Sequence, residues 1–511
     1  MLNQNSVAAE KKQNPVSAFF DKFFHFSERG GSLSSEIGAG IGAFLIAAAS
    51  FLMNTQIIGS IYGNYAGSYL AITLVAMIGT ILLGVLTNRP LVMSANLALS
   101  TSMVSLVGAH SGMTYSNLVV LTTIASLIAL AISISPLGKK VGEILPVSVR
   151  KALPIAVGLL VILEAVNASG IVSDNGFETL TWGGENSLQS IYVVIAVVGI
   201  LAFIVMKALH VRKTAFRLFG AMIGLMWAFG IIFFNEYFIG GQTATIAVYH
   251  RVNTFFTTDG ASCYNIGLGF SSVKWGSLFT EGFDFSAVEG AGLVWVKGIL
   301  IYLVFALFGN VSYLHAAAAT GDYIGADAKV EEIQKTLMVV NGVNVVSGAV
   351  LAAPMASVSS TSSVLSNDEG KTGLSSIVTG IGFFAMMFTW IVFGLTATGT
   401  HGVGMWIELS ETKLAAYVQD SFLFADVVMA LVGCMMLKGL KNLDFKSPRE
   451  LAAVIATVVG TLFVKDLGFG IALGVITDVL FSFADKKEEG NAIVKYGSLV
   501  VGLAYAVLAM F

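Results

Sequence analysis

Residues 90–102 read PLVMSANLALSTS, and residues 354–363 read PMASVSSTSS. Each stretch begins with proline and is rich in small hydroxyl side chains, although the chain around it is strongly apolar. A continuous membrane helix needs roughly 20 apolar residues, and interrupted backbone survives at membrane depth only where protein or a water-filled cavity surrounds it. The matched pair therefore predicts two broken helices that meet at a binding site for a small polar solute. The alternative is that these Ser and Thr residues only pack helices and bond back to carbonyls.

The composition indicates a polytopic membrane protein. The 511 residues are 56% hydrophobic and 12% charged, against about 25% charged in soluble domains. A net charge of -3 provides no basic field for nucleic acid, and 2 cysteines and 6 scattered histidines provide no disulfide framework or zinc site. No nucleotide-binding loop or catalytic set is recognisable. We therefore expect a protein that is not an enzyme, with no catalytic residues, no cofactor and no metal.

The apolar runs predict an all-α polytopic membrane protein with fourteen spans. The predicted spans lie near 36–58, 68–87, 90–108, 117–136, 150–171, 188–207, 215–239, 291–316, 336–353, 354–366, 373–397, 421–438, 450–464 and 467–484.

The positive charges predict the topology. Lys and Arg gather in the connections 139–151, 207–217 and 438–449 and after the last span, whereas the opposite loops 59–67 and 173–187 carry none. The positive-inside rule then places both termini in the cytoplasm of a multi-pass inner (plasma) membrane protein. We expect no cleavable signal. The stretch FFDKFFHF at residues 19–26 is predicted to be either an interfacial helix or a partly ordered tail.

The chain divides into two halves that echo each other. EIGAG at residues 36–40 opens the first span, and EGAG at residues 289–292 opens the eighth. Seven spans per half would invert the second half relative to the first. The predicted organisation is a cytoplasmic tail, a first repeat, an extracytoplasmic loop, a second repeat and a C-terminal segment, at residues 1–35, 36–239, 240–290, 291–484 and 485–511.

Ionisable groups inside membrane spans are costly and often functional. Glu164 in the fifth span is either a proton carrier or substrate ligand, or a structural acid at a helix interface. Asp426 lies near the start of the twelfth span, the repeat mate of the fifth, and is either functional or in the interface zone. His315 in the eighth span is either a pH-sensitive ligand or a packing residue. Tyr313 and Phe51 either stack on a planar ring or, like most aromatic residues of this chain, face lipid or core.

Several blocks carry a family resemblance. They are FFHFSE from residue 23, SEIGAGI at 35–41, KTGLS at 371–375 with VTG at 378–380, and GFGIALG at 468–474. From about Phe20 onward the chain resembles nucleobase permeases of the nucleobase–cation symporter-2 type, in the adenine/guanine/hypoxanthine branch. The resemblance implies seven-plus-seven inverted repeats, a core domain and a gate domain, and short strands in spans three and ten that meet at the substrate.

The resemblance and the polar stretches together nominate a set of site residues. Asn310 and Thr361 stand where the family has acids, and ANLALS at residues 95–100 replaces the family's Pro-Gly-Met-Gly-Leu-Asn run. The candidate substrate-binding residues are Phe51, Ser94, Asn96, Asn310, Ser312, Ser359, Ser360 and Thr361, and the candidates for proton coupling are Glu164 and His315.

Two functions follow as hypotheses. The first is secondary active transport of purine-like nucleobases across the inner membrane, coupled to H+, by movement of one domain against the other. The alternative is an anion transporter of the same architecture, for sulfate or bicarbonate, because helix N-termini facing a site without acids would favour an anion. The partners are then a small-molecule substrate and membrane lipid, with no nucleic acid. The oligomeric state stays open, with a homodimer among the alternatives.

Overall fold

The structure is a computed structural model. It describes residues 15–168, 172–174, 180–182, 201–202, 205–206, 209, 211, 266–323, 329–388, 393–395, 400–403, 429–464, 467–484, 499 and 502–503. The predicted spans near 188–207 and 215–239 lie almost wholly outside these residues.

The first half consists of helices and three short strands joined by turns and short irregular segments. Its elements are α1 (Pro15–Phe24), α2 (Leu33–Tyr62), α3 (Tyr65–Thr87), β1 (Met93–Ser94), α4 (Leu97–Ala109), α5 (Tyr115–Ile134), η1 (Pro136–Lys139), α6 (Val141–Ile144), α7 (Val147–Ala168), β2 (Val172–Asp174) and β3 (Leu180–Trp182).

The second half follows the same pattern. Its elements are α11 (Ile266–Ser272), η2 (Leu278–Gly282), α12 (Ala291–Val304), η3 (Phe305–Gly309), α13 (Asn310–Gly321), α14 (Ile333–Leu351), β4 (Ser357–Val358), α15 (Ser362–Asn367), α16 (Gly373–Phe388), β5 (Phe393–Leu395), β6 (Thr400–Val403), η4 (Leu437–Asn442), α18 (Pro448–Val464) and α19 (Leu467–Ala484).

One predicted span is too long. The span near 373–397 is not helical throughout, because α16 ends at Phe388 and Phe393–Leu395 form β5, which pairs with β6. A second hairpin, β2 with β3, follows α7 and was also not predicted. Each of the four strands contains a β-branched or aromatic residue, namely Val172, Thr181 with Trp182, Phe393, and Thr400 with Val403, and such residues suit a pleated strand.

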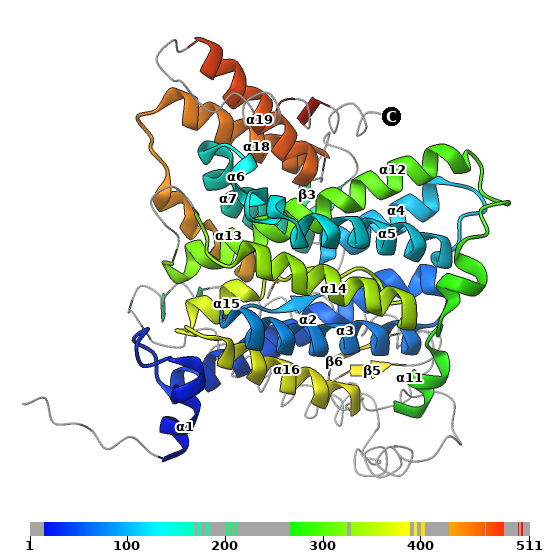
Figure 1. Ribbon diagram of the computed structural model, residues 1–511, viewed down its shortest axis with the longest axis horizontal. Helices are drawn as coiled ribbons and strands as arrows, with labels where there is room; N and C mark the ends of the chain where they lie inside the picture. The colour runs from blue at the N-terminus through cyan, green and yellow to red at the C-terminus, as the bar shows by residue number, and fades with distance from the viewer. Residues whose placement is uncertain are drawn as a thin grey trace, which may run out of the picture.

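The helices of the two halves interleave in a layered bundle. The layers run from α16 through α3, α14 and α5 to α12 across Figure 1, and each packs against the next. A second group, α7 with α18 and α19, lies at the upper left of the same view. The two groups meet chiefly where α7 packs against α13.

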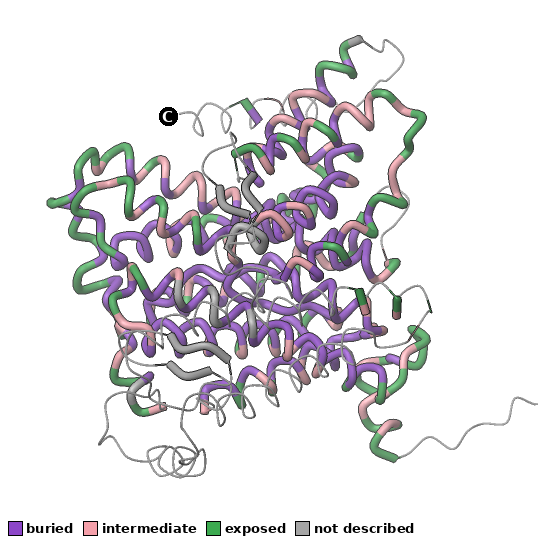
Figure 2. Tube along the Cα trace, turned by 180° about the vertical axis from the view of Figure 1, so that it is seen from behind, coloured by how far each residue is buried: buried purple, intermediate pink, exposed green. Residues whose placement is uncertain are grey.

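Polarity is arranged as expected for a helix bundle in lipid. Within the described residues, three helical stretches are long and apolar enough to cross a membrane: Tyr65–Thr87, Tyr115–Ile134 and Ala291–Gly321. On α3 the exposed positions include Ile78, Leu82 and Val85, which share one face. Many Ser, Thr and Asn residues are instead buried. Figure 2 shows that the buried parts of the chain, in purple, run through the middle of the bundle. Such burial requires hydrogen-bond partners within the protein.

The N-terminal helix matches the predicted interfacial segment in position. In α1, Val16, Phe19 and Phe23 are more than half exposed and lie on one face. The end of α1 is fixed to the bundle, because Asn88 Nδ2 donates to the carbonyl oxygen of Phe24 over 3.0 Å.

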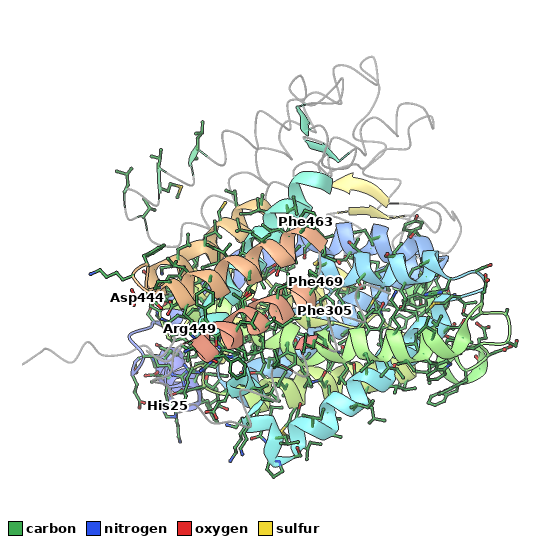
Figure 3. All side chains as sticks on the ribbon, turned by 90° about the horizontal axis from the view of Figure 1, so that it is seen from above. His25, Phe305, Asp444, Arg449, Phe463 and Phe469 are labelled. Atoms are coloured by element: carbon green, nitrogen blue, oxygen red, sulfur yellow. The ribbon has the colours of Figure 1, made fainter. Side chains whose placement is uncertain are left out.

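Small residues allow the helices of the second group to approach closely. A Cβ on Gly470 would lie 1.8 Å from Thr461 Oγ1, and one on Gly474 would lie 1.9 Å from Thr457 Oγ1, so α18 and α19 are in backbone contact there. At the opposite end of α18, Arg449 donates to Asp478 of α19 over 3.0 Å (Figure 3). Asp478 is therefore a structural acid in a membrane-type helix.

The same kind of contact joins α3 and α16. A Cβ on Gly84 would lie 2.6 Å from the carbonyl oxygen of Gly373, which cannot move as a flexible side chain can. We expect Gly84→Ala to destabilise the protein by about 1–3 kcal/mol through overpacking. Gly342→Ala in α14 is the control, because its Cβ would meet only Leu130 Cδ1 at 4.0 Å. Thermal unfolding in detergent should show a lower melting temperature for Gly84→Ala alone. Equal melting temperatures for the two variants would contradict this packing.

Candidate functional site

The two polar stretches meet as a pair of short strands. β1 and β4 run antiparallel, with Met93 opposite Val358 and Ser94 opposite Ser357. The N–H of Ser359 extends the ladder by donating to the carbonyl oxygen of Val92 over 2.8 Å. Both predicted interruptions are thus present, and they lie side by side inside the bundle, where all four paired residues are buried.

Side chains from neighbouring helices complete the backbone hydrogen bonds of β1. The hydroxyl of Thr80 in α3 donates to the carbonyl oxygen of Met93 and accepts from its N–H, both over 3.0 Å. The N–H of Val92 donates to Ser362 Oγ over 2.9 Å, and the N–H of Leu91 donates to Ser376 Oγ over 2.8 Å. The outer edge of this strand therefore has partners without any water or ligand.

Two asparagines form hydrogen bonds with the backbone of β4 and of the residue before it. Asn344 in α14 donates from Nδ2 to the carbonyl oxygen of Ala356 over 2.8 Å and accepts from the N–H of Ala356 over 2.9 Å. Asn310 accepts from the N–H of Val358 over 2.7 Å and donates to the carbonyl oxygen of Ala306 over 2.8 Å. Ala306 lies in the π-helical turn η3, where the usual helical hydrogen bond is displaced.

A small cavity of about 20 Å³ lies beside the strand pair. Its polar lining comes from α2, from the start of α4, from α13 and from the turn after β4: Ser50, Asn54, Asn96, Tyr313, Ser359 and Ser360. Its apolar lining includes Leu160 and Val161 of α7 together with Met429. None of the described lining residues is charged.

The two polar atoms of the Asn96 side chain, Oδ1 and Nδ2, have different roles. Its Oδ1 caps α4 by accepting from the N–H of Ala98 over 3.1 Å. Its Nδ2 has no hydrogen-bond partner among the residues that the structure describes. Asn54, in contrast, uses both ends, because Nδ2 donates to the carbonyl oxygen of Ser50 over 2.8 Å and Oδ1 accepts from Ser100 over 2.6 Å. Asn96 is therefore the lining amide best suited to donate to a solute.

The structure brings three of the predicted substrate residues to the cavity, namely Asn96, Ser359 and Ser360. Thr361 lies behind them, and its hydroxyl oxygen accepts from Ser359 Oγ over 3.1 Å. Ser94 is buried next to them and donates to the carbonyl oxygen of Ala95 over 3.1 Å.

The remaining predicted residues lie away from the cavity lining. Asn310 supports β4, and Ser312 donates to the carbonyl oxygen of Phe308 over 2.7 Å within its own helix. Phe51 packs edge-on against Phe383, with ring centroids 4.9 Å apart. His315 is fully buried, and its Nδ1 lies 2.7 Å from the carbonyl oxygen of Val311.

Glu164 is placed only by its backbone. It lies in α7, four residues after Leu160, so the two positions share a helix face. Its side chain lies outside the described residues, and so does all of Asp426.

Ser50 and Asn54 were not singled out from the sequence, whereas Tyr313, a candidate to stack on a ring, does line the cavity. Ser50 and Asn54 are four residues apart in an apolar helix, so they share a face, and this spacing was the available signal. Among the described residues no group of three His, Cys, Asp or Glu side chains could hold a metal ion.

Comparison with curated proteins shows similarity over most of the chain. A guanine/hypoxanthine permease of Bacillus subtilis, PbuO, is 22% identical and covers 89% of this chain and 92% of its own. The guanine/hypoxanthine permease GhxP of Escherichia coli O157:H7 is 24% identical over 90% of both chains, and the adenine permease AdeP of E. coli K12 is 21% identical over 91% of both. The predicted resemblance to nucleobase permeases is confirmed. Together with the apolar helices, it identifies an integral membrane protein.

Comparisons with family models and with solved structures give weaker or no matches. No family model matches the chain. Among solved structures, the transmembrane domain of the cyanobacterium bicarbonate transporter BicA is 12% identical and covers 93% of this chain and 97% of that one, with a TM-score of 0.45. The structure of SLC26A9 is also 12% identical and covers 89% of this chain and 66% of that one, with a TM-score of 0.44, so this chain spans just under two thirds of its length.

The hydrogen bonds around β4 predict unequal roles for two asparagines of α14. Asn344→Ala removes both partners of Ala356 and leaves a buried N–H and C=O unsatisfied, which we expect to cost about 2–5 kcal/mol. Asn341→Ala is the matched control, because Asn341 makes one longer bond, of 3.4 Å, to the carbonyl oxygen of Ala306. The melting temperature in detergent should fall much further for Asn344→Ala. An equal fall in both variants would show that Asn344 does not hold β4.

Proposed function

We propose that this protein is a secondary active transporter of purine-like nucleobases across the inner membrane, coupled to H+. The similarity to guanine/hypoxanthine and adenine permeases over about nine-tenths of the chain is the observation that carries the proposal. These relatives are named as permeases, which supports transport rather than an enzymatic activity. The proposed architecture is fourteen spans in two inverted repeats of seven, with a core and a gate domain.

The lining of the cavity suits a neutral planar solute. Amide and hydroxyl groups of Asn96, Ser359 and Ser360 can exchange hydrogen bonds with the ring nitrogens and exocyclic groups of a base. Tyr313 supplies an aromatic ring at the same cavity.

The same lining argues against the anion alternative. The described lining residues carry no cation that would neutralise sulfate or bicarbonate. Of the two helices that follow the strands, α15 has 6 residues, so its N-terminal field is small.

The cavity is closed in this conformation. A volume of about 20 Å³ has room for about one water molecule and none for a purine ring. Its apolar wall comes from α7 and from Met429, whereas its polar wall comes from α2, α4, α13 and the turn after β4. Because α7 packs with α18 and α19, we regard these three helices as the gate group and the layered helices as the core. Movement of the gate group away from the core would open the cavity.

An ion-pair cluster joins the two groups near one end of the bundle. Lys438 in η4 donates to the carbonyl oxygen of Thr320 over 2.7 Å and to Asp322 over 2.9 Å. Asp322 also pairs with Lys441. Opening toward this end would require these contacts to break.

The positive-inside distribution supports a cytoplasmic location for both termini. Lys139, after the fourth predicted span, and Lys329, after the eighth, line one pocket and thus share a side. Whether the transporter is a homodimer stays open.

Substitution of Asn96 tests the site. Asn96→Ser keeps a side chain that caps α4 but removes the amide donor at the cavity, so folding should survive. We expect saturable uptake of labelled adenine, guanine, hypoxanthine or xanthine in a permease-deficient strain, and at least a tenfold loss in this variant, on the order expected for one lost hydrogen bond to a buried polar group. Asn64→Ser is the control, because Asn64 caps α3 in the same way and does not line the cavity. Absence of saturable uptake of every base by the unaltered protein would sink the proposal.

Two acids test the coupling. Glu164→Gln should weaken the pH dependence of base uptake more than Asp426→Asn, because Glu164 lies one turn from Leu160 and Val161 at the cavity. The measurement is the initial rate of base uptake at several pH values between about 5 and 8. Immunoblots are used to match the protein levels of the variants. If both variants keep the original pH profile, neither acid carries the proton.

A further inference from the structure

We propose that residues 270–283, between α11 and α12, form an interfacial segment whose exposed aromatic side chains lie among the phospholipids of the membrane. These residues belong to the loop that the sequence predicts outside the membrane. In Figure 1 the chain between α11 and α12, in green, runs along the right-hand edge of the bundle, where several helices end. The inference does not depend on which solute the protein transports.

Hydrogen bonds fix the interfacial segment to the ends of two core helices. The N–H of Lys274 donates to the hydroxyl of Tyr62, at the end of α2, over 2.7 Å. The N–H of Gly276 donates to the carbonyl oxygen of Val350, near the end of α14, over 2.9 Å. The Lys274 ammonium also lies 5.4 Å from the centroid of the Tyr62 ring. The segment is therefore attached to the bundle along its length and is not a free loop.

The segment lies at the depth where the membrane-type helices begin. Both α3 and α5 are long and apolar enough to span a membrane, and so is the stretch that begins with α12. A Cβ on Gly67, in the first turn of α3, would lie 2.2 Å from the carbonyl oxygen of Ser272. Asn117 Nδ2, in the first turn of α5, donates to the carbonyl oxygen of Gly282 over 3.0 Å. These contacts place the segment level with the ends of spanning helices, where a bilayer has its headgroup region.

Four large aromatic side chains of this segment are exposed. Phe270, Trp275, Phe279 and Phe283 are 40%, 49%, 70% and 54% exposed. Phe270 and Trp275 stack with their ring centroids 6.1 Å apart, and Phe279 and Phe283 lie about one turn apart at η2. Large apolar groups gathered on a surface mark an interaction site, and aromatic residues are enriched where a protein meets the membrane–water interface.

The aromatic residues continue the lipid-facing surface of α12. Leu293 and Val296 are exposed in the first turns of this helix, although the stretch is of membrane-spanning type. Phe283 stacks on Trp295 of the same turns, with ring centroids 6.4 Å apart. Exposed apolar side chains on a spanning helix contact acyl chains. Phe283 therefore adjoins lipid, which identifies lipid as the material that covers the exposed aromatic side chains.

The segment can enter the interface without leaving its polar groups unpaired. Trp275 Nε1 donates to the carbonyl oxygen of Phe270 over 2.9 Å, so the indole N–H needs no water. The backbone N–H groups of Trp275 and Phe279 donate to the carbonyl oxygens of Val273 and Gly276, both over 2.9 Å. Backbone groups close to lipid require such partners within the protein.

A carboxylate marks the side of the chain that faces water. Asp284 directly follows the segment and is exposed, and its Oδ1 accepts from Ser286 Oγ over 2.6 Å. An ionised carboxylate is costly to remove from water. Ser286, which is also exposed, therefore lies on the aqueous side.

Spin labels test the depth of the segment. In a background with Cys263→Ser and Cys434→Ser, the labelling sites are Phe279→Cys or Phe283→Cys, and Ser286→Cys is the control on the aqueous side. The full-length labelled protein is reconstituted into vesicles of phosphatidylethanolamine and phosphatidylglycerol. Electron paramagnetic resonance then measures the accessibility of each label to O2, an apolar gas that partitions into acyl chains, and to a water-soluble nickel chelate.

The ratio of oxygen to nickel accessibility should be severalfold higher at positions 279 and 283 than at position 286. A ratio at either of the two positions as low as that at position 286 would place the segment in water and overturn the proposal. Low accessibility of both labels to both reagents would also overturn it, because the aromatic side chains would then be covered by protein, such as a second copy of this chain.

Discussion

The structure depends on satisfying the backbone where two membrane-type helices are interrupted. Around residues 91–94 and 356–359 the chain is extended inside a bundle, so helical hydrogen bonds are unavailable and water is excluded. The strands pair with each other on one edge. The side chains of Thr80, Asn344 and Asn310 form hydrogen bonds with the remaining backbone N–H and C=O groups of Met93, Ala356 and Val358. Each unsatisfied group in such surroundings would cost several kcal/mol. Most of the buried polar side chains near the strands are therefore committed to the fold.

This commitment decides which polar groups remain for a solute. Asn310 and Asn344 are fully used by backbone, whereas Asn96 uses its oxygen as a helix cap and keeps its amide hydrogens. Polar side chains at such a site thus divide into two kinds, those that hold the strands and those that line the cavity. The distinction explains how a region rich in Ser, Thr and Asn can hold two interrupted helices in place and still leave polar groups at the cavity.

The helices pack closely within each of the two groups, and the small closed cavity lies between the groups. Glycines at the α3–α16 and α18–α19 contacts bring backbones together and make each group of helices stiff. The contact between the groups, at α7 and α13, is where the small cavity lies and where apolar residues from one group meet polar residues from the other.

The amino-acid sequence alone determined the membrane class, most helix positions and the two interruptions, because apolar length and Pro-started polar stretches are local properties that the bilayer constrains directly. It also singled out Asn96, Ser359 and Ser360. Only the tertiary structure decided that Asn310 and Ser312 bond to backbone, that Ser50 and Asn54 reach the cavity, and that α16 gives way to a strand before residue 397. The physical reason is that a polar side chain's role depends on which neighbouring backbone group is left without a partner, and those neighbours lie far away in the chain.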